Sequence, residues 1–181
     1  MITELIPTRN TWTLYAHYIS NSDNYQTSYT KLCDVASFQD FGRMWNHTHP
    51  KLVGDPTRAV FIQSKRVTSW SFFKDGVLPE WEHPSNENGI TYTLRMAMSC
   101  NDVYTLWEIL VAHCTLSTHP HALNGIQVSR KGATVRLREP GLLMKFDLWF
   151  SSSCSHSDII EWFSRVIPNY PFSHSPRTPV C

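Results

Sequence analysis

The sequence predicts an α+β fold in which a curved, mainly antiparallel sheet is covered on one face by helices and leaves the other face free for loops and a ligand. Many segments alternate apolar and polar residues, or are rich in β-branched and aromatic residues, as strands are. Three other segments repeat apolar residues at helical spacing. Most connections are short turns, which favour antiparallel neighbours.

The first half of the chain is expected to begin with two strands and a helix. The strands expected in this half are residues 11–19, 29–35 and 67–73. A polar loop between the first two carries Tyr25 at its far side. Ser37 is the expected N-cap of a helix, because apolar residues follow it at helical spacing. Residues 58–63 are ambiguous between a strand and a short helix.

The second half is expected to contain further strands and two helices. The strands are residues 90–98, 126–129, 135–138 and 143–150, with turns at Lys131-Gly132 and Pro140-Gly141. Asn101 or Asp102 caps a helix whose apolar face includes Trp107. The last helix covers residues 158–167.

The length of 181 residues fits one domain with a substantial core, which we expect to span residues 1–170. After Pro168 the chain is rich in Ser and Pro, so residues 171–181 are expected to form a flexible tail. No internal repeat or linker divides the chain.

Composition narrows the functional classes. A net charge of +1 argues against a protein that coats long nucleic acid, so a nucleic-acid site should be local, with a few Lys or Arg residues around a pocket. Seven Trp and seven Tyr exceed what core packing usually needs, which indicates that some rings serve a ligand or a partner. The five Cys form no C-x-x-C pair and are expected to be free thiols. Neither a signal peptide nor a membrane span is expected.

The most informative segment is residues 73–82, Phe-Lys-Asp-Gly-Val-Leu-Pro-Glu-Trp-Glu, which places Trp81 beside Glu82 on a loop. A Trp ring offers a flat apolar π-face, and the neighbouring carboxylate offers two hydrogen-bond acceptors. Together they suit a planar ligand with N–H donors along one edge, such as guanine. A positive charge on the base, as in 7-methylguanine, adds a cation–π attraction of roughly 0.5–2 kcal/mol.

For several other residues, a purely structural role is the better explanation. Trp12, Trp107 and Trp162 lie within periodic apolar patterns, so we assign them to the core. Tyr25 and Glu82, each taken alone, are an ordinary loop tyrosine and a solvated loop acid. Trp81 differs because it lies in a loop next to a turn and an acid.

Nothing in the sequence argues for catalysis, a metal or another cofactor. The H-x-H pairs at residues 47–49 and 119–121 have no Cys or carboxylate at zinc-site spacing, so surface histidines are expected. There is no P-loop, no G-x-S-x-G and no Gly-rich dinucleotide turn.

The order and spacing of several segments resemble the eukaryotic translation initiation factor 4E family, the mRNA cap-binding proteins. The resemblance runs from about residue 7 to residue 168, and its most specific part is the segment 73–82. The weaker matching segments are residues 10–12, 24–26, 40–46, 88–89, 106–107, 125–128 and 145–149.

This resemblance implies a cupped antiparallel sheet with helices on its convex face and a cap pocket on its concave side. The family holds a 7-methylguanine base between two aromatic rings, which correspond here to Trp81 and to Tyr25, where the family more often has Trp. Glu82 would accept hydrogen bonds from the base edge. Trp149 best matches a third Trp that contacts the N7-methyl group, although a competing register places Arg138 there and leaves the third Trp missing.

The resemblance also implies cations that hold the phosphate bridge. Lys145 matches one of them, and the other falls at Arg130 or Lys131, since the register allows either. Strand alternation favours Lys131, whereas the guanidinium of Arg130 is the better fork for phosphate, so both are kept. Residues 133–142, with Arg136 on one face, look like an insertion relative to the family.

The family docks a scaffold protein of the factor 4G type, or a 4E-binding protein, on the helical back of the sheet. The matching surface comprises Pro7, Phe38, Gly42, Trp45 and Glu108. Gly42 stands where the family has an exposed Trp anchor, and Glu108 stands where an apolar residue is usual. We therefore expect a partner to bind through altered contacts.

The sequence thus predicts a non-enzymatic protein that binds the 7-methylguanosine 5′ cap of mRNA and acts in translation initiation or its regulation, in the cytoplasm or the nucleus. Tyr25 and Gly42 also allow an alternative, a protein-interaction or repressor module on the same fold with weak or no cap binding. Both departures from the family pattern indicate a divergent member of the family. Similar departures occur in protozoan paralogues that bind unusually methylated caps.

A nucleotide-processing enzyme is the less favoured alternative. It would need clustered acids that hold a divalent metal near the phosphates. The acids around the Trp81 loop are scattered instead: Asp75, Glu80, Glu82 and Glu87.

Overall fold

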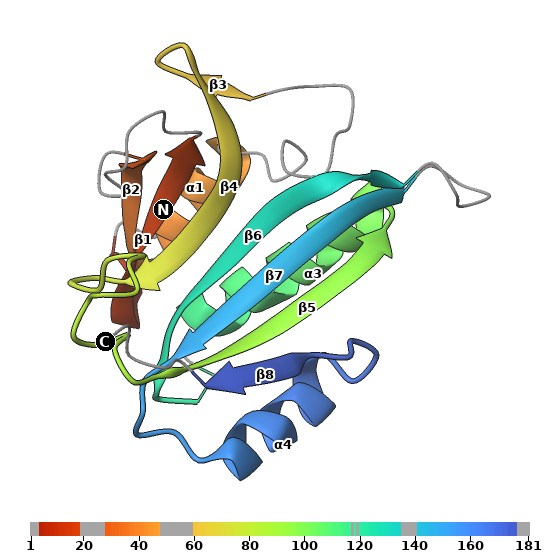
Figure 1. Cartoon of the computed structure of the whole chain (residues 1–181). Coiled ribbons are helices and arrows are strands. Elements are labelled where there is room, and N and C mark those ends of the chain that lie inside the picture. Colours follow the sequence, from red (N-terminus) through yellow and green to blue (C-terminus); the bar gives the residue numbers. More distant parts are fainter. Residues whose placement is uncertain are drawn as a thin grey trace.

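The computed structural model describes residues 4–18, 28–47, 60–116, 118, 120–134 and 141–176 (Figure 1). The strands are β1 (Pro7–Tyr18), β2 (Tyr29–Ser37), β3 (Phe61–Ile62), β4 (Lys65–Lys74), β5 (Ile90–Met98), β6 (Leu123–Thr134), β7 (Gly141–Phe150) and β8 (Ser173–Pro176). The helices are α1 (Phe38–His47), α3 (Cys100–Thr115) and α4 (His156–Val166).

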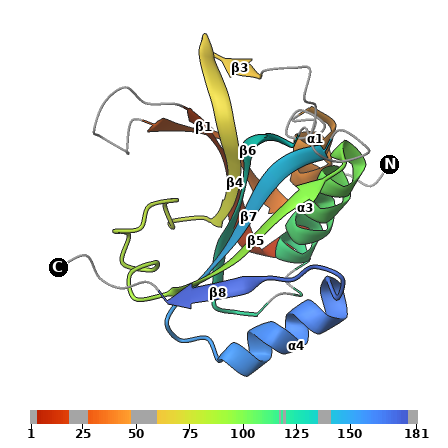
Figure 2. The same cartoon turned by 45° about the vertical axis from the view of Figure 1, so that its right-hand side comes forward.

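Antiparallel pairing joins the strands in the order β2-β1-β4-β6-β7-β5-β8, with β3 paired to β4. Figure 2 shows the sheet curving, with α1 and α3 on its convex side and the loop between β4 and β5 on its concave side. The predicted α+β fold with a curved antiparallel sheet is therefore confirmed. None of the helices in the described part of the chain is long and apolar enough to span a membrane.

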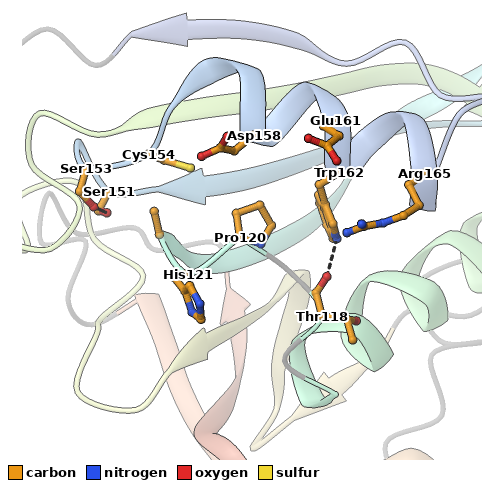
Figure 3. Close-up of a pocket in the computed structure, with 11 residues that line it drawn as sticks. Thr118, Pro120, His121, Ser151, Ser153, Cys154, Asp158, Glu161, Trp162 and Arg165 are labelled. Atoms are coloured by element: carbon orange, nitrogen blue, oxygen red, sulfur yellow. Dashed lines mark hydrogen bonds between the residues drawn. The ribbon is translucent and has the colours of Figure 1, made fainter.

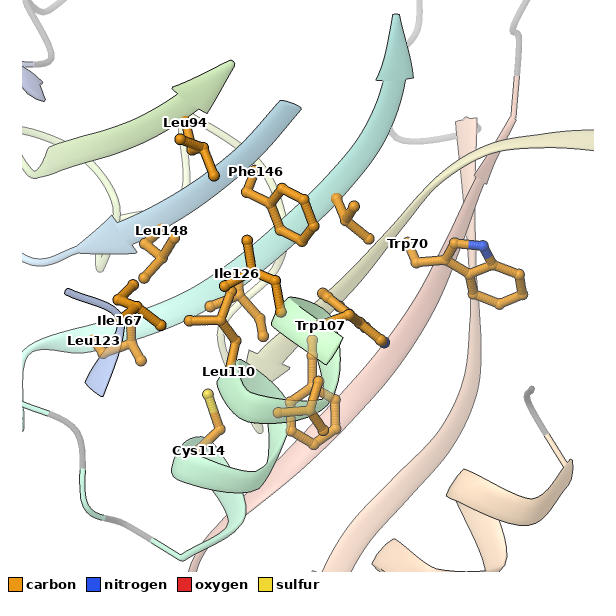
Figure 4. Close-up of a cluster of buried hydrophobic side chains, with 14 of the residues drawn as sticks. Trp70, Leu94, Trp107, Leu110, Cys114, Leu123, Ile126, Phe146, Leu148 and Ile167 are labelled. Carbon is orange, nitrogen blue, oxygen red and sulfur yellow. The ribbon is translucent and has the colours of Figure 1, made fainter. Parts of the chain in front are cut away.

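Strand alternation sorts side chains onto the two faces of the sheet. On β1, Trp12, Leu14 and Ala16 belong to the large core between the sheet and α3, part of which Figure 4 shows. The predicted core positions of Trp12, Trp107 and Trp162 are confirmed, with 0%, 4% and 2% of each residue exposed.

A second, smaller apolar cluster lies on the concave face. Its buried members are Tyr15, Phe73, Val77 and Trp149, one each from β1, β4, the loop after β4, and β7. The ring of Phe73 lies over Gly125 of β6, where a Cβ would stand 2.4 Å from the ring carbons. The absence of a side chain at residue 125 therefore makes room for this cluster.

Two helix caps test the sequence predictions. Ser37 caps α1 as predicted, since its Oγ accepts from the backbone N–H of Asp40 at 3.1 Å and donates to the Asp40 carboxylate at 2.7 Å. For α3 the predicted cap is wrong by two or three residues. Ser99 is the N-cap, and its Oγ accepts from the backbone N–H of Asp102 at 3.2 Å.

Two element predictions need correction. Lys131-Gly132 is not a turn but lies within β6, which stays paired with β7 as far as Thr134 and Gly141. The expected tail at residues 171–181 includes β8, which pairs with the free edge of β5 and satisfies its backbone groups. The ambiguous segment 58–63 contains the strand β3. The strand expected at residues 135–138 lies outside the described residues.

Two glycines should respond oppositely to alanine. Gly125→Ala should lower the free energy of unfolding by about 1–3 kcal/mol, because the buried ring of Phe73 must move. Gly42→Ala should raise it by roughly 0.5–1 kcal/mol, because Gly42 lies inside α1 and nothing lies within 4 Å of its Cβ position. Urea unfolding of both variants measures the difference, and equal effects would contradict the packing described for Gly125.

Candidate ligand-binding site

A pocket of about 300 Å³ opens on the concave face. Strands β1, β4, β6 and β7 supply most of its wall, together with Trp81 from the loop after β4. Its lining residues are His17, Tyr18, Ser28, Thr68, Ser69, Trp81, Gln127, Ser129, Arg130, Lys131, Lys145 and Asp147. Four of the residues singled out from the sequence are therefore brought together: Trp81, Arg130, Lys131 and Lys145.

An irregularity in β6 places two consecutive cations at the pocket. Arg130 pairs with Met144 and Gly132 pairs with Leu143, so Lys131 is an extra residue in the ladder. Such a bulge breaks the strict alternation of side chains. Both Arg130 and Lys131 consequently line the pocket, and their role in holding phosphates stays a prediction.

Trp81 is held by a second indole. Its ring centroid lies 4.4 Å from that of Trp149, with 38° between the ring planes. Trp149 is 1% exposed and also meets the ring of Phe73 edge-on at 5.3 Å. Trp81, by contrast, is 45% exposed. Trp149 thus lies beneath Trp81 rather than in the pocket wall, and its contact with an N7-methyl group stays a prediction.

Hydrogen bonds from asparagine side chains fix the loop that carries Trp81. The side-chain NH₂ of buried Asn86 donates to the backbone carbonyls of Leu78, at 2.9 Å, and Glu80, at 2.8 Å. Asn124, at the start of β6, donates in turn to the Asn86 side-chain oxygen at 3.2 Å. Because these bonds satisfy carbonyls on both sides of Pro79, the loop is positioned before any ligand arrives.

A buried acid ties the same loop to β2. Glu80 is 7% exposed, and its Oε1 accepts a hydrogen bond from the hydroxyl of Tyr29 at 2.5 Å. Tyr29 packs against the rings of Tyr15 and His17 at 5.6 and 5.5 Å. Sequence reasoning missed this role, because only the strand register brings Tyr29 opposite the loop. Glu82, the predicted reader of the base edge, is exposed directly after Trp81.

The floor of the pocket is polar but uncharged near β1 and β4. His17 is 3% exposed, and its Nε2 lies 2.7 Å from the hydroxyl oxygen of Ser71. Burial lowers the pKa of His17 to about 4, so the ring is neutral near pH 7. Beside it, the Gln127 amide donates to the hydroxyl of Ser69 at 3.2 Å.

An acid shares the other end of the floor with Lys145. The Nζ of Lys145 lies 2.6 Å from Oδ2 of Asp147, which is 4% exposed. The other carboxylate oxygen accepts from the hydroxyl of Thr93 at 2.6 Å. Asp147 was not identified from the sequence, although its position two residues after Lys145 on one strand places both on the same face. The charge of Lys145 is thus already paired within the pocket.

The predicted partner surface lies on the convex side, around α1 and α3. Pro7, Phe38 and Glu108 are exposed. Gly42 presents no side chain, and nothing lies within 4 Å of where its Cβ would be. Trp45 is only partly buried.

Trp45 joins the two helices of this surface. Its ring stacks on that of Phe41, one turn earlier, at 5.7 Å. The same ring meets Tyr104 of α3 at 5.6 Å. The apolar part of the surface is therefore fixed in place even though the anchor expected at residue 42 is lacking.

A larger pocket of about 460 Å³ lies elsewhere, beside α4 (Figure 3). Its residues include Asp158, Glu161 and Arg165, and none of the positions predicted to bind a ligand. Trp162 in its wall is 2% exposed and donates its indole N–H to the carbonyl of Thr118 at 3.0 Å. This indole is a satisfied core residue and offers no ring face as a platform, so we place the candidate site on the concave face.

Some predicted residues lie outside the described part of the chain. These are Tyr25, Arg136 and Arg138. Each H-x-H pair has one member there, since His49 and His119 are not described. Within the described ranges, no group of three or more His, Cys, Asp or Glu residues could hold a metal ion.

Comparison with known proteins gives one family. The family model described as "Eukaryotic initiation factor 4E" matches residues 7–169. A eukaryotic translation initiation factor 4E homolog from Acanthamoeba polyphaga mimivirus is 26% identical over 148 residues, which are 72% of this chain and 53% of the relative. The chain therefore spans about half the length of that curated relative.

Solved structures share the fold. A schistosome eIF4E, complexed with m7GpppA and 4E-BP, matches with a TM-score of 0.70 and 19% identity, covering 98% of this chain and 94% of that one. Ascaris suum eIF4E-3, complexed with the m2,2,7G cap, matches with a TM-score of 0.68 and 16% identity over 98% and 94% of the chains. C. elegans eIF4E-3, in complex with the 4E-binding protein Mextli and a cap analog, matches with a TM-score of 0.69 and 16% identity over 97% and 99%.

Proposed function

Because the chain belongs to the eukaryotic initiation factor 4E family, we propose that it binds the 7-methylguanosine cap of mRNA in the concave pocket and acts in translation initiation or its regulation. The observation that carries this proposal is Trp81, a half-exposed indole backed by the buried ring of Trp149 at the mouth of a pocket lined by Arg130 and Lys131. An aromatic platform beside cations is what a base joined to phosphates requires.

Recognition of the base begins with stacking on Trp81. A methylated guanine carries a positive charge, which the indole face attracts by roughly 0.5–2 kcal/mol more than a neutral base. Trp149 keeps the Trp81 ring from tilting away from the base. Tyr25 would close over the other side of the base, and Glu82 would accept hydrogen bonds from its N1–H and 2-amino groups.

The phosphates would lie toward β6, where the bulge presents Arg130 and Lys131. A guanidinium binds phosphate through two parallel N–H bonds, while an ammonium acts as a point charge. Lys145 contributes less than an isolated lysine would, because Asp147 already offsets its charge. The mechanism is recognition without a catalysed step.

Titration with 7-methyl-GTP should quench the tryptophan fluorescence of the native chain. Trp81→Leu should weaken binding about 5- to 150-fold, since stacking of one base on an aromatic ring contributes roughly 1–3 kcal/mol. Glu82→Gln should reduce the preference for 7-methyl-GTP over 7-methyl-ATP and should leave the stability of the fold unchanged. Trp45→Leu, on the convex side, is the matched control and should leave the affinity unchanged.

Absence of quenching in the native chain would overturn the proposal. That result would favour the alternative function, an interaction or repressor module on the same fold. Hydrolysis of the cap on long incubation with Mg²⁺ would instead favour a nucleotide-processing enzyme.

Asp147 should limit the affinity for phosphates. Asp147→Asn releases the charge of Lys145, and a partly buried charge a few ångströms from a phosphate is worth on the order of 1 kcal/mol. Binding of 7-methyl-GTP should therefore tighten by about 3- to 10-fold, and binding of 7-methyl-GMP should tighten less. The double variant Lys145→Gln/Asp147→Asn is the control and should return the ratio of the two affinities toward the native one. An unchanged ratio in Asp147→Asn would contradict this role.

We also propose that a scaffold protein of the factor 4G type, or a 4E-binding protein, docks on the convex side around Phe38 and Trp45. The schistosome and C. elegans complexes, which contain 4E-BP and Mextli, support a partner of this kind by analogy. Exposed Phe38 and the Trp45–Tyr104 contact offer apolar area, while Gly42 offers none. The contacts are therefore altered and weaker than those of an anchor with a large side chain.

Gly42→Trp should restore the missing anchor. Its affinity for a helical 4E-binding peptide, measured by calorimetry, should rise by about 30-fold or more, since a buried aromatic anchor is worth roughly 2 kcal/mol or more. Gly42→Ala is the matched control, because it stabilises α1 without adding an anchor. Equal affinity in Gly42→Trp and Gly42→Ala would show that the partner does not use this position.

A further inference from the structure

The hairpin of β3 and β4 extends past the sheet. Figure 1 shows it projecting at the top of the molecule, beyond the end of β1. Gln63 and Ser64, which join the two strands, have φ values of 50° and 65°. A two-residue turn with both φ values positive has the twist that antiparallel strands require. The backbone bond from the N–H of Val67 to the carbonyl of Val60, at 2.8 Å, closes the base of the hairpin.

The two faces of this hairpin differ in chemistry. Ile62 and Val67 pack against the main core. Their neighbours Phe61 and Arg66 are paired across the two strands and lie on the opposite face. Thr68, two residues after Arg66, lines the concave pocket, whereas Val67 between them packs on the core. The face of Phe61 and Arg66 therefore continues the pocket wall outward.

Both residues of this pair are accessible. Phe61 is 61% exposed, and within residues 60–74 it is the only large apolar side chain that is exposed. Arg66 and its neighbour Lys65 are exposed as well. Lys65 pairs with Ile62 and so lies on the other face, where its Nζ is 5.6 Å from the centroid of the Tyr18 ring. Residues 60–74 contain no Asp or Glu, so nothing on this segment offsets the two positive charges.

We propose that this hairpin binds the single-stranded RNA that follows the cap, with a base stacked on Phe61 and a phosphate held by Arg66. This inference rests on the proposed function, because the cap in the pocket would deliver the RNA to the hairpin. An isolated aromatic ring beside a cation fits a nucleotide, which presents a flat base and a charged phosphate. A protein partner would need a wider apolar patch, and the hairpin offers one apolar side chain only.

The test compares free cap analogue with capped RNA. Calorimetry or anisotropy gives the affinities of 7-methyl-GTP, of a capped RNA of about eight nucleotides, and of the same RNA without its cap. The native chain should bind the capped RNA more tightly than 7-methyl-GTP. Phe61→Ala should reduce that advantage by about 5- to 150-fold, the usual loss of one stacked base, and leave the affinity for 7-methyl-GTP unchanged.

Three variants serve as controls. Phe61→Tyr keeps the ring and should keep the advantage of the capped RNA. Arg66→Ala should weaken the same advantage and make binding less sensitive to salt. Ile160→Ala removes another exposed apolar side chain, on α4, and should change neither affinity. Thermal unfolding establishes that each variant is folded, as the exposure of residue 61 leads us to expect.

The outcomes separate this inference from the proposed function. If 7-methyl-GTP binds but capped RNA binds no more tightly, or if Phe61→Ala leaves that advantage intact, the hairpin proposal is overturned and cap binding stands. If 7-methyl-GTP does not bind, the proposed function fails, and weaker binding of uncapped RNA to Phe61→Ala would still support the hairpin. If Phe61→Ala weakens the binding of a protein partner but not the binding of RNA, the hairpin proposal is overturned.

Discussion

The contact between the indoles of Trp81 and Trp149 is the interaction on which the concave site depends. A half-exposed Trp on a loop has many orientations, and ordering it for a ligand costs conformational entropy. Here a buried ring lies beneath it, and Asn86 fixes the backbone on either side of Pro79. Most of that cost is therefore met during folding. Gly125 is part of the same arrangement, since it admits the Phe73 ring that packs against Trp149.

Charge is distributed unevenly over the wall of the concave pocket. His17 is buried and kept neutral, which leaves the floor near β1 polar without charge. Lys145 and Asp147 lie side by side and offset each other. The other described cations that line the pocket are Arg130 and Lys131 at the bulge of β6, and the β3–β4 hairpin beyond them carries Lys65 and Arg66. This layout matches a ligand with a cationic group at one end and anionic groups at the other end. A methylated guanine nucleotide is such a ligand.

Local patterns allowed much of the fold to be predicted, because they depend on neighbours in the chain. The cap at Ser37 and the buried position of Trp107 follow from spacing alone. Long-range pairing determined what was missed. The bulge that exposes Lys131 arises from the register with β7, which no periodicity reveals. Glu80 gains its role from a tyrosine distant in sequence, and the last strand forms because β5 has an open edge. Asp147 could have been found by placing it on the same strand face as Lys145.

A crystal structure of the chain with 7-methyl-GTP tests the central claim most directly. The account predicts the methylated base stacked on the face of Trp81 that points away from Trp149, with phosphate oxygens within hydrogen-bond distance of Arg130 or Lys131. A base bound in the pocket beside α4, or bound to Trp149 after Trp81 has swung away, would contradict it.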